Sequence, residues 1–282
     1  MINIIISCTP NYSNRRVINT TNKKIDMVSQ FLILYRSIKD NWKFDYRINL
    51  FYNKNILFDE KDLKALSSLD IDMFGISPDD IKTPYMLRCN ALTCNLNRSG
   101  SHRLLIDCDT IALGNPNFDL SCDWQAMYAN SVIREKYYDY INKKFKYNLN
   151  LKDKIKGKLF CKYMSGENSE GFFPHFNGGA FLIRESLCGA FKELTVPSYG
   201  IAYDDSVPEH IRHIGVQYGA SFALMNISKN WKPFDAGFNY LVKEFDVNKF
   251  GKDNITLLHY CGIGGFEVAY ANFRRTIDSY TD

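Results

Sequence analysis

The sequence predicts an α/β fold, folded as a single compact domain around a mixed, mainly parallel sheet with helices on both faces. Compact apolar runs of strand length alternate with longer segments whose apolar residues recur at helical spacing. Such alternation implies right-handed βαβ units and a largely parallel sheet. The 282 residues include 45% hydrophobic and 23% charged residues, which is enough for a sizeable core. No repeat, low-complexity segment or linker divides the chain.

The alternation is clearest in the first half of the chain. Residues 2–8 (INIIISC) form an apolar run that predicts a buried first strand, and a polar loop follows over 9–24. Residues 27–42 have the length and spacing of a helix. The next expected elements are a strand over 46–52, a helix over 61–68, a strand over 71–76, a helix over 85–96 and a strand over 103–106.

The second half is less regular. The elements expected there are strands over 124–129, 175–183 and 255–259, and helices over 185–194 and about 207–217. Residues 135–162 carry nine lysines against three acids, interleaved with tyrosine and phenylalanine. A solvated helical insertion is the favoured interpretation of this segment. The alternative is a platform for an acceptor or for the membrane surface, in which aromatic rings meet sugars and lysines meet anions.

Charge and cysteine content narrow the class of protein. The net charge of +4 is too small to indicate a nucleic-acid partner. The eight cysteines include no CxxC pair and no zinc-site spacing, and several lie in apolar runs, as reduced core cysteines do. The N-terminal apolar run is too short for a secretory leader, and no stretch approaches the ~20 apolar residues of a membrane span. We therefore expect a cytoplasmic protein.

Two carboxylates stand at the end of the predicted strand over 103–106, in the stretch RLLIDCDTIALGN. In an extended chain Asp107 and Asp109 point to one side and Cys108 to the other. They fall at the carboxyl end of a strand, where parallel α/β sheets bind ligands. Paired carboxylates suit a hard divalent cation such as Mg²⁺ or Mn²⁺. A solvated turn with two acids is the alternative interpretation.

Two enzyme classes use an apolar strand that ends in this DxD pattern. In haloacid-dehalogenase-like phosphatases the first aspartate is a nucleophile, and Asp204 and Asp205 could serve as the later acidic pair of that class. That motif normally lies on the first strand, whereas three predicted strands precede it here. The place of the DxD pattern along the chain therefore favours the metal-dependent glycosyltransferases of the GT-A type, in which DxD follows a nucleotide-binding βαβ half.

Five motifs occur in order between residue 2 and about residue 265. They are SCTPNYS after the first strand, TPYMLRCNAL before the DxD strand, DCD itself, HFNGG, and HYCG near the end, with a Tyr-Asp-Asp turn between the last two. This order resembles family 8 glycosyltransferases, especially the bacterial lipooligosaccharide galactosyltransferases. The resemblance implies a GT-A fold with a Rossmann-like nucleotide-binding half over 1–115. It also implies a donor-sugar and acceptor half over 116–282, with an acceptor-side insertion over 130–172.

The resemblance also implies roles for individual residues. Asp107, Asp109 and His259 would ligate Mn²⁺ or Mg²⁺, which bridges the diphosphate of a nucleotide sugar. Asn177 would contact the donor sugar, and Tyr12 would stack on the base. The residues expected to contact the donor or its metal are Thr9, Asn11, Tyr12, Arg88, Asp107, Cys108, Asp109, Gly178, Gly179 and Gly262. Each residue outside the DxD pair also has a structural interpretation without a ligand. Thr9, Asn11 and Tyr12 could belong to an ordinary polar loop, and Arg88 could be an exposed arginine on a helix. The stretch 177–179 could be a tight entry into a strand, and His259 could be an imidazole without a metal.

The sequence departs from the family pattern at two places. A lysine normally follows HYxG and supports the diphosphate, but this chain continues GIGGFEVAY. Glycine amides, Arg88 or Lys243 would have to take its place. Asp205 aligns with the residue near the reacting carbon, where a carboxylate would be a nucleophile for retention or a base for inversion. Asp204 and Asp205 could equally cap the following helix. Retention is the favoured outcome.

Together these patterns predict an enzyme that moves a hexose or related sugar from a nucleotide-diphosphate sugar, UDP-sugar being favoured, to a glycan acceptor. The expected acceptor is a bacterial glycan such as capsule, O-antigen or lipooligosaccharide, including a lipid-linked glycan. Peripheral contact with the membrane surface would be made through residues 135–162. Two alternatives stay open, namely the phosphatase and a non-catalytic glycan- or nucleotide-binding relative.

Overall fold

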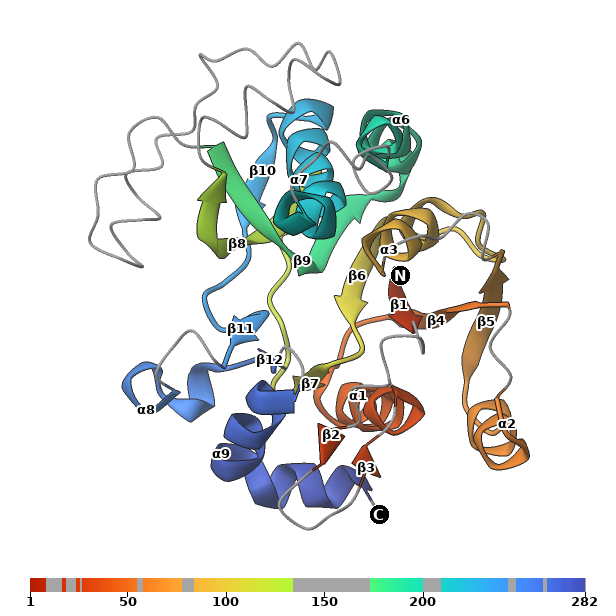
Figure 1. Ribbon diagram of the computed structural model, residues 1–282, viewed down its shortest axis with the longest axis vertical. Helices are drawn as coiled ribbons and strands as arrows, with labels where there is room; N and C mark the ends of the chain where they lie inside the picture. The colour runs from red at the N-terminus through yellow and green to blue at the C-terminus, as the bar shows by residue number, and fades with distance from the viewer. Residues whose placement is uncertain are drawn as a thin grey trace.

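A seven-stranded sheet forms the centre of the molecule (Figure 1). The computed structural model describes residues 1–8, 17–18, 24–25, 27–54, 58–77, 84–133, 173–199, 209–242, 247–260 and 263–281. Within them the strand order is β10-β8-β9-β6-β1-β4-β5. The strands are β1 (Ile2–Cys8), β4 (Tyr46–Asn53), β5 (Ile71–Ile76), β6 (His102–Asp107), β8 (Trp124–Ile133), β9 (Phe173–Arg184) and β10 (Trp231–Pro233). Only the pairings of β9 with β6 and with β8 are antiparallel, so the predicted mixed, mainly parallel sheet is confirmed.

Smaller sheets and helices surround this centre. One sheet has the order β11 (Tyr240–Leu241), β12 (Leu257–His259), β7 (Thr110–Ala112), and the other pairs β2 (Val17–Ile18) with β3 (Lys24–Ile25). The helices are α1 (Met27–Asn41), α2 (Glu60–Ser67), α3 (Pro84–Thr93), α6 (Cys188–Tyr199), α7 (Glu209–Ile227), α8 (Val247–Phe250) and α9 (Ile263–Thr281), with 3₁₀ turns η4 (Glu185–Leu187) and η6 (Lys252–Asn254). None of the helices in the described ranges is both long and apolar enough to cross a membrane.

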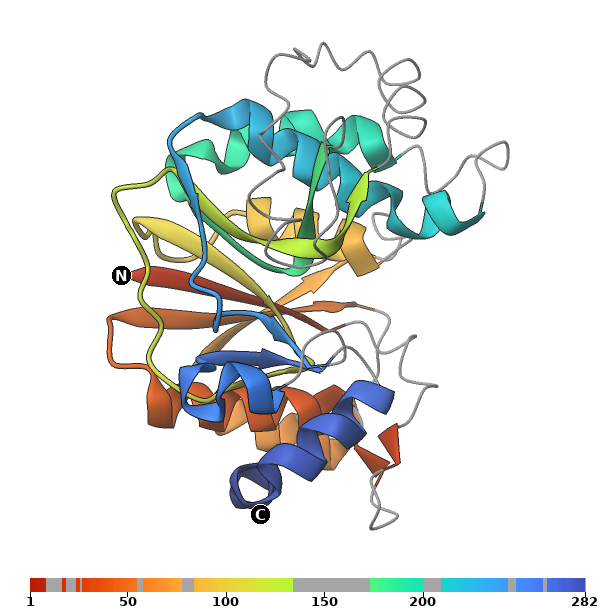
Figure 2. The same ribbon diagram turned by 90° about the vertical axis from the view of Figure 1, so that its left-hand side faces the viewer.

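The parallel strands β1 and β6 are buried on both faces, because helices cover the sheet from both sides (Figure 2). On one face Ile4 and Ile6 of β1 belong to the same apolar cluster as Phe31 of α1. On the other face Ile5 of β1 and Leu105 of β6 join a second cluster with side chains of α3, α6 and α7. Each fully buried side chain of this kind contributes about 1.5–3 kcal/mol relative to an exposed one.

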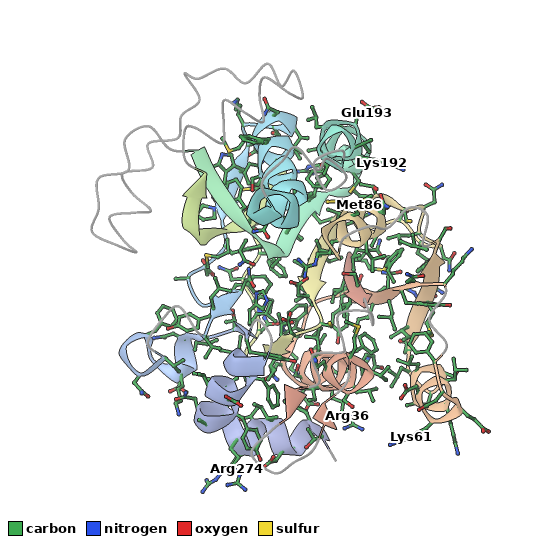
Figure 3. The ribbon with its side chains drawn as sticks, viewed as in Figure 1. Arg36, Lys61, Met86, Lys192, Glu193 and Arg274 are labelled. Carbon is green, nitrogen blue, oxygen red and sulfur yellow. The ribbon has the colours of Figure 1, made fainter. Side chains whose placement is uncertain are left out.

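Long charged side chains lie at the periphery of this layered core (Figure 3). Lys61 on α2, Lys192 on α6 and Arg274 on α9 are exposed. Charged side chains pointing outward and apolar side chains filling the layers are the pattern expected of helices that cover a sheet. Charges that lie inside the molecule therefore need a specific explanation, and the strongest case is found at the carboxyl end of β6.

The structure corrects several predicted boundaries. The helix expected over 85–96 ends at Thr93, where the Thr93 hydroxyl donates to the Cys89 carbonyl at 2.9 Å. The helix expected to end near 217 continues to Ile227. The helix expected from 185 begins with the 3₁₀ turn η4 and ends at Tyr199. The loop expected over 9–24 includes β2, which pairs with β3. Helix α9 is not among the elements that the sequence predicts.

The buried His102 at the start of β6 makes folding pH-dependent. Its side chain is almost fully buried, and Nε2 contacts the Cys122 carbonyl oxygen at 3.1 Å. Burial lowers the pKa of His102 below its usual 6.5, because the imidazolium form loses its hydration, and the Cys122 carbonyl only partly counteracts this.

We expect the free energy of unfolding to fall as the pH drops below 6.5, because the unfolded chain then binds a proton that the folded chain does not. His102→Gln keeps the size and polarity but cannot titrate, so its free energy of unfolding should fall less. Urea unfolding of both proteins at neutral and at mildly acidic pH measures this difference. An equal pH dependence in the two proteins would contradict the assignment.

Candidate metal and donor site

The site begins where β6 ends. Asp107 is the last residue of β6 and is 4% exposed. A tight turn follows, in which the Thr110 hydroxyl donates to the Asp107 carbonyl at 2.7 Å. Because β6 runs parallel to β1, with Asp107 opposite Ser7, this turn lies at the carboxyl edge of the parallel strands. Ligands bind at this edge in α/β sheets, as the sequence predicts.

The histidine comes from a strand far along the chain. His259 is the last residue of β12, which runs antiparallel to β7 with His259 opposite Thr110. The backbone N–H of Tyr260 donates to the Asp109 carbonyl at 3.1 Å and extends this pairing by one residue. The small sheet therefore fixes His259 beside the turn that carries both aspartates.

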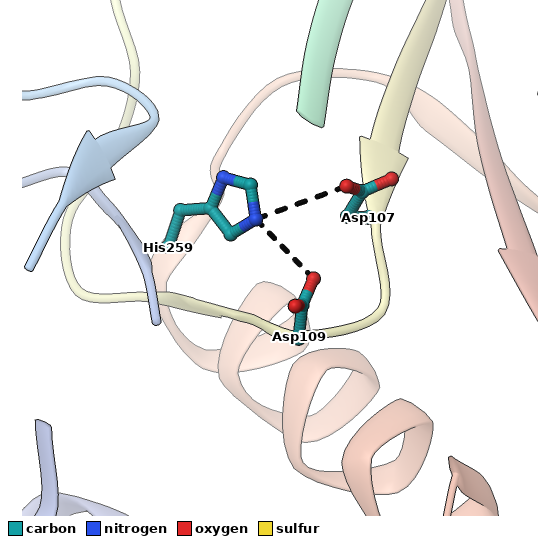
Figure 4. Close-up of side chains that lie close together, drawn as sticks. All are labelled: Asp107, Asp109 and His259. Carbon is teal, nitrogen blue, oxygen red and sulfur yellow. Dashed lines mark ion pairs between the residues drawn. The ribbon is translucent and has the colours of Figure 1, made fainter. Parts of the chain in front are cut away.

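Asp107, Asp109 and His259 converge on one point (Figure 4). His259 Nε2 lies 3.3 Å from Asp109 Oδ1 and 3.7 Å from Asp107 Oδ2. One ligand atom from each residue lies within 4.8 Å of the others, the one such group of His, Cys, Asp or Glu found in the described ranges. The side chains of Asp107 and His259 are 6% and 5% exposed, whereas that of Asp109 is 24% exposed. Asp109 is therefore the carboxylate that solvent or a ligand can reach most easily.

Arg88 compensates the charge of the buried aspartate. It lies on α3, and its Nη2 forms an ion pair with Asp107 Oδ2 at 2.6 Å. The pKa of Asp107 is raised to about 6 in all, because burial, with a smaller contribution from Asp109, outweighs the opposite effects of Arg88 and His259. For Asp109, burial also acts to raise the pKa, but His259 and Arg88 outweigh it, and the pKa is lowered.

These residues fit a divalent cation. Asp107 Oδ1 is buried and has no hydrogen-bond partner among the described residues, which is costly for a carboxylate oxygen unless a cation approaches it. Two carboxylates and one imidazole are a donor set suited to Mn²⁺ or Mg²⁺.

The strand β9 brings the HFNGG stretch against His259. The backbone N–H of Gly179 donates to Asn177 Oδ1 at 2.7 Å. A Cβ added to Gly179 would overlap His259 Cε1 and would lie 2.6 Å from its Nδ1. Glycine is thus required at 179 by the close approach of the imidazole, a steric reason that the motif alone did not reveal.

The sequence analysis missed Asn239. Its Oδ1 contacts His259 Nδ1 at 2.8 Å, and its Nδ2 donates to Asn177 Oδ1 at 3.2 Å. Asn239 is fully buried and has a positive φ of 61°. Asparagine tolerates the left-handed region better than most residues, which is the one local signal that its sequence context, GFNYL, offered.

The other predicted residues divide into two groups. Cys108 is buried in the apolar cluster that includes residues of α1, and Gly178 is buried in β9, while the predicted contacts of both with the donor or its metal stay predictions. The predicted residues Thr9, Asn11, Tyr12, Asp204, Asp205, Lys243 and Gly262, and the segment 135–162, lie outside the described residues. Their roles stay predictions.

Gly179→Ala should lower the free energy of unfolding by about 1–3 kcal/mol, because the methyl group has to displace the His259 ring. Gly189→Ala on α6 is the matched control, since a Cβ there meets nothing within 4 Å and alanine favours a helix by about 0.5–1 kcal/mol. Urea unfolding measures both. If the two variants proved equally stable, the close packing of β9 against His259 would be wrong.

Comparisons with known proteins bear on the fold. The sequence matches no protein-family model and no curated protein. The structure resembles that of the galactosyltransferase LgtC in complex with donor and acceptor sugar analogues, with a TM-score of 0.53 and 12% identity over 99% of this chain and 96% of LgtC. An active-site mutant of LgtC gives a TM-score of 0.51 and 12% identity over 98% of this chain and all of the other.

This likeness extends over nearly the whole length of both chains, so it concerns the complete arrangement of sheet and helices and not one shared βαβ unit. The predicted GT-A fold is thereby confirmed. The chain has the fold of a GT-A glycosyltransferase and resembles LgtC in structure.

Proposed function

We propose that the chain is a metal-dependent glycosyltransferase that moves a hexose or related sugar from a nucleotide-diphosphate sugar to a glycan acceptor. The observation that carries the proposal is the convergence of Asp107, Asp109 and His259 at the carboxyl edge of the sheet in a GT-A fold. Fold alone does not fix activity, but this donor set stands where such sheets bind their ligands.

The two aspartates and His259 would hold Mn²⁺ or Mg²⁺. When bound, such an ion neutralises the diphosphate leaving group of the donor and so acts as a Lewis acid. The side chains of Asp107 and His259 are nearly fully buried, and Asp109, at 24% exposed, is the ligand that a substrate would reach most easily. UDP-sugar is the favoured donor, by resemblance.

Arg88 is our candidate for the phosphate-binding cation that replaces the missing lysine. Its guanidinium already lies at the site, on Asp107 Oδ2, and the planar fork of a guanidinium matches phosphate oxygens well. Arg88 is 18% exposed, so it has room to meet a ligand. Lys243 and the amide of Gly262, which lie outside the described residues, are the alternatives.

In the transfer, the bond between the anomeric carbon and the donor phosphate oxygen breaks, and its electron pair leaves with the diphosphate. In retention the sugar is first carried by the nucleophilic carboxylate, which the acceptor hydroxyl then displaces, giving its proton to an oxygen of the departed diphosphate; in inversion the hydroxyl attacks the donor directly and gives its proton to the carboxylate base. We assign Asp205, with Asp204, to the reacting carbon, as nucleophile for retention, which is favoured, or as base for inversion. Asn177 would meet the donor sugar through its amide nitrogen, because its Oδ1 already accepts two hydrogen bonds.

The acceptor half is proposed by resemblance. A capsular polysaccharide, an O-antigen or a lipooligosaccharide would enter from the side of 116–282, with 130–172 over the acceptor. The lysine- and tyrosine-rich segment 135–162 would supply rings for sugars and cations for anionic groups, or contact the membrane surface peripherally.

A screen of UDP-, GDP- and CDP-sugars, with release of the nucleotide as the readout, tests the proposed reaction. We expect release from UDP-hexoses, slow with water and faster with a glycan acceptor. Release of phosphate from phosphomonoesters, with a covalent phosphoaspartate at Asp107, would instead indicate the phosphatase. Binding of a nucleotide sugar without turnover in the presence of Mn²⁺ would indicate a non-catalytic relative.

The metal ligands give a second expectation. Asp109→Asn and Asp107→Asn should each lower Mn²⁺-dependent release of UDP by on the order of 100-fold or more, because each removes a charged ligand. Asp253→Asn, at an exposed position on η6, is the matched control and should keep wild-type activity. Full activity in a protein carrying both Asp107→Ala and Asp109→Ala would rule out the metal site.

A further inference from the structure

A chain of three hydrogen bonds links the backbone of β9 to the ring of His259. It runs from the Gly179 N–H to Asn177 Oδ1 at 2.7 Å, from Asn239 Nδ2 to the same oxygen at 3.2 Å, and between Asn239 Oδ1 and His259 Nδ1 at 2.8 Å. The last contact is buried and the other two are partly buried. Figure 4 shows that Nδ1, the ring nitrogen at the end of this chain, faces away from both aspartates.

The direction of every bond in this chain follows from its first member. A backbone N–H can only donate, so Asn177 must present its oxygen to Gly179. The group of Asn239 that faces this oxygen must therefore be its NH₂, because two carbonyl oxygens would repel. Asn239 then presents its oxygen to His259, and an amide oxygen only accepts, so Nδ1 carries the proton.

A proton on Nδ1 leaves a lone pair on Nε2 of a neutral ring. That lone pair faces Asp109 Oδ1 at 3.3 Å and Asp107 Oδ2 at 3.7 Å, which are also acceptors when ionised. In the neutral ring these three atoms are all electron-pair donors, so the arrangement needs a cation between them, which is a proton on Nε2 or a metal ion. The hydrogen bonds on the far side of the ring thus prepare Nε2 for a metal ion.

The backbone of Asn239 is held in an unusual conformation for this contact. Its φ of 61° is the one positive φ of a non-glycine residue in the described part of the chain, and the side chain is fully buried. Residues in sparsely populated backbone regions persist where their surroundings over-determine them, and they cluster at functional sites. The residue with this uncommon backbone conformation is therefore the one whose side chain contacts the proposed metal ligand His259.

We propose that Asn239 is a positioning residue that fixes the Nδ1–H tautomer of His259 and keeps Nε2 available to a divalent cation. Asn177 and the Gly179 N–H fix the orientation of Asn239 in turn. The inference rests on the metal site of the proposed function, but it concerns protonation within the protein and does not depend on the reaction or the donor.

His102 provides an internal reference for the tautomer, because its neutral ring should carry the proton on the other nitrogen. Its Nε2 contacts the Cys122 carbonyl oxygen at 3.1 Å. A carbonyl can only accept, so in His102 the proton lies on Nε2. His259 and His102, which are both buried, should therefore show opposite tautomers in one spectrum, with His259→Gln and His102→Gln used to assign the signals.

The first measurement is a two-bond proton–nitrogen correlation spectrum of metal-free protein labelled on histidine, at about pH 8.5, where an ordinary imidazole is neutral. We expect a protonated Nδ1 in His259 and a protonated Nε2 in His102. In Asn239→Gly, which keeps the positive φ but removes the carboxamide, the proton of His259 should move to Nε2, where Asp109 accepts it. A bare Nδ1 in the wild type, or an unchanged His259 signal in Asn239→Gly, would overturn the proposal.

The second measurement is the affinity for Mn²⁺, followed by electron paramagnetic resonance of the free ion without any donor. Asn239→Gly should weaken binding about 10- to 100-fold, the usual effect of removing a hydrogen-bond partner of a metal-bound histidine. Asn239→Asp keeps an oxygen acceptor for Nδ1–H and should restore most of the affinity. Asn49→Ala, which removes a buried carboxamide on β4, is the control and should lower stability without changing Mn²⁺ affinity.

The outcomes separate this proposal from the proposed function. Absence of Mn²⁺ binding to the wild type would contradict the metal site, and with it the purpose of the tautomer, whatever the spectrum shows. Mn²⁺ binding without sugar transfer would contradict the glycosyltransferase and leave the role of Asn239 intact. Equal Mn²⁺ affinity in Asn239→Gly and the wild type would overturn the role of Asn239 alone.

Discussion

At the carboxyl end of β6, the buried carboxylate of Asp107 lies between the guanidinium of Arg88 and the imidazole of His259, and Asp109 contacts the same ring nitrogen, Nε2. A buried carboxylate without partners would cost several kcal/mol, so the fold is constrained to bring compensating partners to this point. Arg88 comes from α3 and His259 from β12, so elements from both halves of the chain meet here. A divalent ion would compensate the remaining carboxylate oxygen in the same way, because Asp107 Oδ1 still lacks a hydrogen-bond partner among the described residues.

The strand pairings place each group where the chemistry needs it. The parallel pairing of β6 with β1 sets the edge at which Asp107 stands, and the antiparallel pairing of β7 with β12 sets His259 beside the turn. Strand β9, antiparallel to β6, brings Gly179 against the imidazole and Asn177 against Asn239. The ring is therefore held from one side by carboxylates and from the other by amides, which orients it more firmly than either contact could alone.

Most of the central sheet and the aspartate pair could be predicted from the sequence. The strands β1, β4 and β6 have apolar runs that are largely buried, and β5 has one that is partly buried, so the local pattern is enough to predict them. The strands β7, β10 and β11 have two or three residues and exist through their pairing, which leaves no periodic signal. Asn239 was missed for a related reason, since its role depends on side chains from β9 and β12 that are distant in the sequence. His259 was found through a family resemblance and not through any local pattern.

The measurement that tests the central claim most directly is anomalous diffraction from crystals of the protein soaked in Mn²⁺. The account predicts one strong anomalous peak bounded by carboxylate oxygens of Asp107 and Asp109 and by Nε2 of His259. It further predicts that His259 Nδ1 keeps its contact with Asn239 in the loaded crystal. A map without a peak at this position, or with a peak held by other residues while Arg88 still covers Asp107, would contradict the account.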